Sequence, residues 1–152
     1  MDFFKEFKSV ISTLEQAQIP YALCGGLAVG VHAEPRATKD IDILLLTEDV
    51  ERTKQALLLC GFKFFSTPMF FAENKIELHK LTKIDRNIGD YIFLDLVLIK
   101  SPETAKIWES RQRLVWENQP IWIVSREWLI WMKKLRSSPL DLIDIDALEK
   151  SS

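Results

Sequence analysis

The sequence predicts an α+β fold, with α and β elements mixed along the chain, in one domain that spans residues 1–152. Three observations lead to this prediction. The segment Asp2–Gln18 repeats apolar side chains at the spacing of an amphipathic helix. Two apolar runs, Asp40–Leu46 and Tyr91–Ile99, have the length and composition of buried strands. Apolar residues make up 47% of the chain and charged residues 28%, which is typical of a folded domain and excludes a disordered one.

The N-terminal helix is expected to end at Ile19-Pro20, because proline cannot continue the hydrogen-bond ladder of a helix. Tyr21–Cys24 is then short enough for a buried strand. Gly25-Gly26 turns the chain into a second helix over roughly Leu27–Ala33, and Pro35 marks its exit.

Thr47 and the two acidic residues after it indicate a helix that runs to Cys60 and ends at Gly61. Ser125 caps a later helix over Arg126–Arg136, and a last helix runs to about Leu148. The remaining expected elements are a hairpin of Phe62–Phe65 and Met69–Ala72, a strand over Ile76–Ile84, a helix start at Ser101-Pro102-Glu103, and a hairpin of Arg113–Trp116 and Ile121–Val124.

Charge and composition also bound the function. The net charge of −2 does not indicate a constitutive nucleic-acid binder, although basic residues outnumber acidic ones between Lys100 and Arg136. That segment either faces a phosphate-bearing ligand or forms solvated helix faces. No apolar run approaches the ~20 residues that span a membrane, and the two cysteines lack metal-ligand spacing. We therefore expect a cytoplasmic protein with no membrane partner.

Asp40 and Asp42 are the first candidate site residues. Residues two apart in a strand project from one face about 7 Å apart, so Ile41 and Ile43 would face the core. Two such carboxylates can hold Mg²⁺, which prefers oxygen ligands and substrate phosphates. The alternative is a pair of solvated acids at an exposed strand start. The apolar run after Asp42 indicates an internal strand, where unpaired acids are costly, so the metal-binding pair and the solvated pair are about equally favoured.

Asp95 is the one charged residue inside the apolar run Phe93–Ile99. A carboxylate buried there without compensation would have a raised pKa, and a metal shared with Asp40 and Asp42 would relieve that cost. The alternative is an ion pair with a basic residue such as Arg36, Arg86 or Lys133. Three acids on two strands suit two-metal chemistry on a nucleoside triphosphate.

Gly25-Gly26 lies between an expected strand and an expected helix, where glycine lets the backbone approach a phosphate group closely. The pair alone is a weak signal. It does not match the G-x-G-x-x-G dinucleotide fingerprint, and a Walker A loop is absent from the sequence.

Together these motifs resemble those of a known family. Gly25-Gly26-x-Ala28, Arg36-x-Thr38-x-Asp40-x-Asp42 and a later strand Asp95 resemble the DNA polymerase beta-like nucleotidyltransferase superfamily. Leu129-Ile130-x-x-Lys133, followed by Asp141-Leu142-x-Asp144-Ile145, looks like a motif of its abortive-infection toxin-type members, to which the resemblance is closest. The resemblance covers about Tyr21–Leu148.

The resemblance implies a nucleotidyltransferase-like mixed β-sheet flanked by helices. It implies transfer of a nucleoside monophosphate from a nucleoside triphosphate (NTP), such as ATP, to an acceptor hydroxyl, with Mg²⁺ or Mn²⁺ bound. The resemblance implies that Gly25 and Gly26 bind the β- and γ-phosphates and that Arg36 and Thr38 bind the nucleotide. Asp40 and Asp42 would ligate a metal ion, and Asp95 would ligate the second metal or activate the acceptor hydroxyl. Lys133 would pair with a phosphate or brace the site.

The sequence departs from the family at three points. Gly26 replaces a frequent serine, and Ser138 and Leu140 stand where toxin-type members usually have Arg and Lys, with Arg136 nearby. The chain is short for a full toxin, so an acceptor-binding domain is either missing or supplied by a protein partner or a second copy. The acceptor stays open between RNA, protein and a small molecule. The rival hypothesis is a catalytically inactive module of this fold that binds a nucleotide or a protein partner.

Two further pairs are expected to be structural. Glu77 and His79 share a strand face and could line the site, but a solvent-facing pair is favoured. Trp128 and Trp131 lie three residues apart on a helix and could stack a base, but core packing is favoured.

Overall fold

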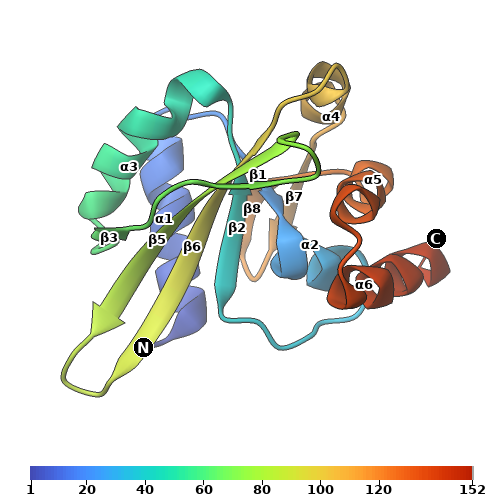
Figure 1. Cartoon of the computed structure of the whole chain (residues 1–152). Coiled ribbons are helices and arrows are strands. Elements are labelled where there is room, and N and C mark those ends of the chain that lie inside the picture. The colour runs from blue at the N-terminus through green and yellow to red at the C-terminus, as the bar shows by residue number, and fades with distance from the viewer. Residues whose placement is uncertain (152) are drawn as a thin grey trace.

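A computed structural model describes residues 1–151 of this chain (Figure 1). The helices of this part are α1 (Phe3–Gln16), α2 (Gly25–His32), α3 (Val50–Leu58), α4 (Thr104–Glu109), α5 (Arg126–Arg136), α6 (Pro139–Lys150) and the 3-10 turn η1 (Thr47–Asp49). The strands are β1 (Ala22–Cys24), β2 (Asp40–Leu44), β3 (Phe64–Phe65), β4 (Met69–Phe71), β5 (Ile76–Asp85), β6 (Asp90–Ile99), β7 (Gln112–Trp116) and β8 (Gln119–Ile123).

All the described strands belong to one mixed sheet, in the order β3-β5-β6-β2-β1-β8-β7, with β4 paired to β5. Strand β2 is parallel to β6, and β1 is parallel to β8, whereas the β1/β2, β5/β6 and β7/β8 pairs are antiparallel. The predicted α+β fold with a mixed sheet flanked by helices is confirmed.

The helices form two groups beside the sheet. Helices α1 and α3 pack together, and α2, α5 and α6 pack together on the side of β1 and β2 (Figure 1). The second group faces the side chains of Asp40 and Asp42. Ile41 and Ile43 project from the opposite face of β2 and are fully buried, as their alternation with the acids predicts.

The connection between α5 and α6 sets the position of the C-terminal charged residues. Ser137 ends α5 in the left-handed conformation, with φ of 54°. Ser138 then caps α6 through a capping box in which its hydroxyl accepts from the Asp141 N–H and the Asp141 carboxylate accepts from the Ser138 N–H. This tight turn brings Lys133 on α5 opposite Asp141 on α6.

Two predicted elements differ from the structure. The expected hairpin of Phe62–Phe65 and Met69–Ala72 is wrong, because β3 and β4 each pair with the long strand β5 and not with one another. Helix α4 begins at Thr104, later than Ser101. Ser101 instead forms a turn, in which its carbonyl accepts from the Thr104 N–H at 3.2 Å.

The expected core packing of Trp128 and Trp131 is confirmed. The rings of Trp128 and Trp131 lie 5.4 Å apart between centroids and pack against the core. Among the described residues, no helix is both long enough and apolar enough to cross a membrane.

Candidate active site

The site begins at the glycine turn between β1 and α2. Gly25 has φ of +68°, a conformation that side chains rarely adopt, and a Cβ atom there would overlap the Asp42 carboxylate. A Cβ atom on Gly26 would lie 2.6 Å from Nη2 of Arg36. The two glycines therefore let an acidic and a basic side chain approach the backbone at the start of α2.

Asp42 and Asp95 face each other across the parallel pair of β2 and β6, where they occupy the same register position. Burial, followed by the charge of Asp95, a hydrogen bond with Asp95 and the charge of Asp40, raises the pKa of Asp42 to about 8. Burial, followed by the charge of Asp95, also raises the pKa of Asp40. The three acids are close enough to repel one another.

Lys80 is the cation next to these carboxylates. Its Nζ lies 2.9 Å from Oδ1 of Asp95, but that oxygen accepts no hydrogen bond of acceptable geometry. The alternative to a shared metal was an ion pair of Asp95 with a basic residue such as Arg36, Arg86 or Lys133, and the structure pairs Asp95 with Lys80. The reason is register, because Lys80 on β5 lies directly opposite Asp95 on β6.

The donor chemistry of Asp40, Asp42 and Asp95 fits a hard divalent cation, because all three offer carboxylate oxygens and one buried oxygen lacks a hydrogen bond. Within residues 1–151, however, no three His, Cys, Asp or Glu side chains already converge as a ligand cluster. Metal binding would therefore require the Asp95 carboxylate to exchange Lys80 for the cation.

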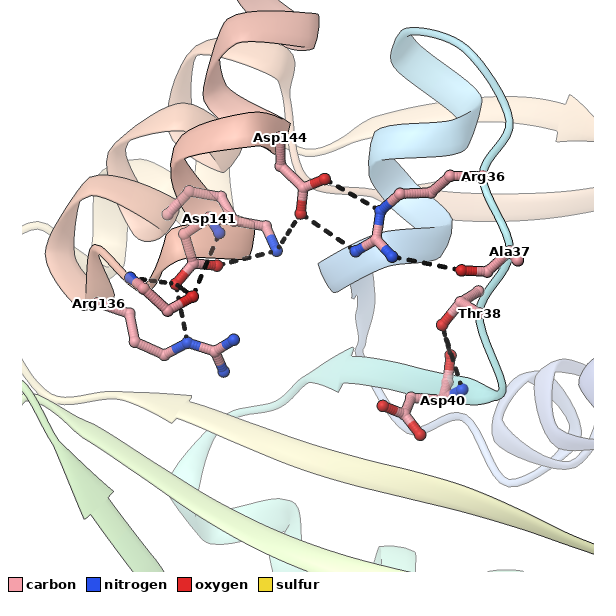
Figure 2. A network of polar contacts seen from close by, with 9 residues as sticks. Arg36, Ala37, Thr38, Asp40, Arg136, Asp141 and Asp144 are labelled. Atoms are coloured by element: carbon pink, nitrogen blue, oxygen red, sulfur yellow. Dashed lines mark hydrogen bonds and ion pairs between the residues drawn. The ribbon is translucent and has the colours of Figure 1, made fainter.

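Arg36 and Thr38 lie on the loop that leads from α2 into β2. The Arg36 guanidinium pairs with both carboxylate oxygens of Asp144, at 3.0 Å from Nε and 3.1 Å from Nη2 (Figure 2). The Thr38 hydroxyl accepts a hydrogen bond from the Asp40 N–H at 3.2 Å. This contact holds the backbone where Asp40 enters the strand.

Lys133 on α5 is buried, with 9% of its surface exposed. Its Nζ lies 3.0 Å from Oδ2 of Asp144 and 3.3 Å from Oδ1 of Asp141. Arg136 pairs with the other oxygen of Asp141 through Nε at 2.9 Å. Figure 2 shows the two acids between basic groups, with Arg36 and Arg136 on opposite sides of the network. Asp141 and Asp144 thus hold three cations in place.

One cavity of about 160 Å³ joins the glycine turn, the acids and this charged network. Every predicted site residue lines it: Gly25, Gly26, Arg36, Thr38, Asp40, Asp42, Asp95 and Lys133. The sequence reading did not assign a role to Arg136, or to the apolar lining of Phe71, Ile76, Leu78 and Leu140. The apolar residues come from β4, β5 and α6, and no local sequence signal placed these elements beside the glycine turn.

His79 lies outside the cavity. Its Nε2 is 2.7 Å from Glu77 Oε2, and Glu77 also pairs with Lys100. The expected pairing with Glu77 is correct, but the expected solvent-facing position is wrong, because His79 is buried. It lies opposite Leu96, on the face of the sheet away from Asp95.

Comparisons with known proteins agree with the fold. No protein-family model matches the chain, and no curated protein matches it. An antigenic nucleotidyltransferase-like protein from Paracoccidioides brasiliensis matches with a TM-score of 0.58 and 19% identity, over 95% of this chain and 75% of that one. A candidate nucleotidyltransferase from Thermotoga maritima matches with a TM-score of 0.64 and 13% identity, over 94% and 89%.

A third structure is ANT(2″)-Ia in complex with adenylyl-2″-tobramycin. It matches with a TM-score of 0.65 and 17% identity, over 93% of this chain and 84% of that one. At these identities the likeness shows the fold, which is that of nucleotidyltransferases. The closeness to abortive-infection toxin-type members stays a prediction.

Proposed function

We propose that this protein is a nucleotidyltransferase that transfers a nucleoside monophosphate from an NTP to an acceptor hydroxyl, with Mg²⁺ or Mn²⁺ bound. One observation carries the proposal. The Asp42 carboxylate lies against the Gly25 backbone and in register with Asp95, so a candidate phosphate turn and a cluster of carboxylates form one site. The nucleotidyltransferase fold of the structural neighbours supports the same function.

In this proposal Asp40, Asp42 and Asp95 would hold the divalent cations. When bound, these ions would neutralise the triphosphate and stabilise the charge that develops on the leaving pyrophosphate. The Gly25 and Gly26 backbone would bind the β- and γ-phosphates, because the start of α2 offers free N–H groups and a positive dipole. Arg136 and Lys133 line the same cavity and would supply positive charge to the phosphates.

The reaction forms one bond and breaks one bond at the α-phosphorus. The acceptor hydroxyl oxygen bonds to this atom, while the bond to the oxygen that bridges the α- and β-phosphates breaks and pyrophosphate leaves. In the alternative role of Asp95, in which it does not hold the second metal, its carboxylate would receive the hydroxyl proton after Lys80 is displaced from Oδ1. Lys133 and Arg36 keep their positions through Asp141 and Asp144.

We further propose that residues 1–152 form a single domain, and that the chain is nearest to the toxin-type members. The Lys133, Asp141 and Asp144 network supports the second proposal. A nucleotide-binding module without activity is the second candidate. It is favoured by the Lys80–Asp95 ion pair, which places an ammonium where a catalytic cation would be needed.

Transfer of an α-³²P-labelled NTP to RNA, protein and small-molecule acceptors, together with calorimetric NTP binding, distinguishes the two candidates. The enzyme labels an acceptor, and the variants Asp40→Ala and Asp42→Ala lose labelling. A module binds the NTP and labels no acceptor. Loss of both Mg²⁺-dependent NTP binding and labelling in the unmodified protein would overturn the proposal.

A further inference from the structure

Two aromatic rings continue the line of Asp95 along β6. Phe93 and Tyr91 precede Asp95 by two and four residues, so all three project from the same face of the sheet. The rings of Tyr91 and Phe93 lie 5.0 Å apart between centroids and are inclined by 48°. Phe93 is half-buried, and 42% of the Tyr91 surface is exposed. An accessible aromatic pair therefore begins about 7 Å from the carboxylate and leads away from it.

Two lysines lie over the faces of these rings. Lys80 lies with its Nζ 4.5 Å from the Phe93 centroid and 2.9 Å from Asp95 Oδ1, so it joins the ring to the carboxylate. Lys39 has its Nζ 5.4 Å from the Tyr91 centroid and directly precedes Asp40. The nearby acid Asp90 is paired with the amino group of Met1 at 3.0 Å. Lys80 is already paired with Asp95, and Asp40 lies opposite Phe93 in register, so within residues 1–151 Lys39 is the cation beside the rings that has no carboxylate at ion-pair distance.

The face of the hairpin that bears Asp95 has two parts: Val97 and Ile99 line the cavity with the glycine turn, whereas Tyr91 and Phe93 lie outside the lining. The connected ends of β5 and β6 project beyond α2, α5 and α6, which gather at the opposite part of the sheet (Figure 1). Gly25, Gly26 and Lys133 line the cavity on the helix side, whereas Tyr91, Phe93 and Lys39 lie outside its lining. The carboxylates thus separate a candidate triphosphate site from the aromatic pair.

We propose that Tyr91, Phe93, Lys39 and Lys80 form the acceptor subsite, and that it takes a planar anionic acceptor, namely a nucleobase-bearing phosphate compound. This inference rests on the proposed function. A base stacks on the two rings when the ammonium groups of Lys39 and Lys80 move from the ring faces to pair with its phosphate, and a sugar hydroxyl then lies beside Asp95. That hydroxyl bonds to the α-phosphorus of the NTP, pyrophosphate leaves, and the proton passes to Asp95.

The charge of the subsite distinguishes this acceptor from that of a structural neighbour. ANT(2″)-Ia was solved with adenylyl-2″-tobramycin, and tobramycin is an amine-rich compound that is positively charged in neutral solution. The ammonium group of Lys39, which lies over the Tyr91 ring, would repel such an acceptor. The fold is shared, but the acceptor chemistry that these side chains favour is of the opposite charge.

Fluorescence anisotropy with labelled AMP, a labelled single-stranded oligonucleotide and labelled tobramycin tests the subsite. It is measured with Mg²⁺, and with the NTP site saturated by an analogue that has a methylene group between the α- and β-phosphates. Tyr91→Ala removes the ring and should weaken binding of the planar anionic probe about tenfold, because the base loses its stacking contact with Tyr91. Tyr91→Phe keeps the ring and should bind as the unmodified protein does.

Lys39→Gln should also weaken binding of the anionic probe and reduce its dependence on salt, whereas Lys5→Gln on α1 should leave both unchanged. Binding of AMP alone would indicate a free nucleotide acceptor, and binding only of the oligonucleotide would indicate a strand end. Either result supports the subsite. Equal binding by Tyr91→Ala and the unmodified protein, tighter binding of tobramycin, or no binding of either anionic probe would overturn it.

The failure of this inference is distinguishable from failure of the proposed function. NTP binding is measured separately, by calorimetry on the unmodified protein and on Tyr91→Ala, and the two should agree. If the NTP binds but the acceptor probes do not, the subsite is wrong and the nucleotide site stands. If the probes bind through Tyr91 but no NTP binds, the subsite remains and the transferase proposal is wrong.

Discussion

The Asp42 carboxylate lies against the backbone of Gly25, in space that a Cβ atom on residue 25 would occupy. This contact joins the turn between β1 and α2 to the carboxylates of β2 and β6. Glycine is needed at this position for two independent reasons. The backbone is left-handed, and a Cβ atom would overlap Asp42.

Gly25→Ala should therefore destabilise the protein and displace Asp42. Gly89 provides a matched control, because its φ of +69° is nearly the same and a Cβ atom there meets nothing within 4 Å. Both variants carry a backbone cost of about 1 kcal/mol, and Gly25→Ala adds the overlap with Asp42. Urea unfolding should show a larger loss for Gly25→Ala. Equal losses in the two variants would mean that the Asp42 contact contributes nothing.

Asp42 should make the stability of the metal-free protein depend on pH. Its pKa is about 8 in the folded protein, because of burial and then of Asp95, and about 3.9 in an unfolded chain. Between these values the folded protein holds a proton that the unfolded chain has released, so the free energy of unfolding falls as pH rises. Asp42→Asn should flatten this fall and stabilise the metal-free protein at pH 8 by on the order of 2 kcal/mol.

The measurement is urea unfolding in EDTA from pH 4 to 8, with Asp146→Asn as the control, since Asp146 is exposed on α6. The control should follow the unmodified protein. If Asp42→Asn is less stable than the unmodified protein at pH 8, the raised pKa is contradicted.

Lys133 should be important for stability as well as for the site. Lys133→Met removes the ammonium between two acids that are each 1% exposed, although Arg36 and Arg136 remain as their partners. We expect a loss of about 2 kcal/mol, because removing one partner leaves buried charge less compensated. Lys134→Met is the matched control one residue later, where the side chain is exposed and pairs with Glu149 at 3.6 Å. Thermal unfolding should separate the two variants, and equal shifts would contradict the bracing role.

Lys80 should compete with a divalent cation for Asp95. Lys80→Gln removes the ammonium at 2.9 Å from Oδ1 and should increase the affinity for Mn²⁺, measured by electron paramagnetic resonance without nucleotide. Lys83→Gln changes the same charge on the opposite face of β5, where Lys83 pairs with Glu6, and should leave the affinity unchanged. A lower affinity in Lys80→Gln than in Lys83→Gln would show that Lys80 does not compete with the metal.

Local patterns predicted much of this fold and part of the site. The two-residue spacing of Asp40 and Asp42 correctly predicts their shared face, because side chains alternate along any strand. The Ser125 cap and the helix over Arg126–Arg136 are likewise local features, and the structure has both. Asp95 was joined to Asp42 by the cost of burying a lone carboxylate and by the family resemblance, since register between distant strands leaves no local pattern.

The features that the sequence did not reveal depend on pairing between strands. Lys80 lies in a segment where apolar and polar residues alternate only weakly. Its position opposite Asp95 in the sheet shows which acid it pairs with. The same register places His79 on the face of the sheet opposite to Asp95. The spacing of Glu77 and His79 predicts that they share a face, but not which face. For β3 and β4, the choice between pairing with one another and pairing with β5 depends on the tertiary fold.

The central claim is that Asp40, Asp42 and Asp95 hold the metal ions of a triphosphate bound at the Gly25-Gly26 turn. Isothermal titration calorimetry with the methylene-bridged NTP analogue tests this claim most directly, in Mg²⁺ and in EDTA, on the unmodified protein and on Asp42→Asn. We predict binding in Mg²⁺ by the unmodified protein, and at least tenfold weaker binding in EDTA or after the substitution. Equal affinity in Mg²⁺ and in EDTA, or an Asp42→Asn variant that binds as tightly as the unmodified protein, would contradict it.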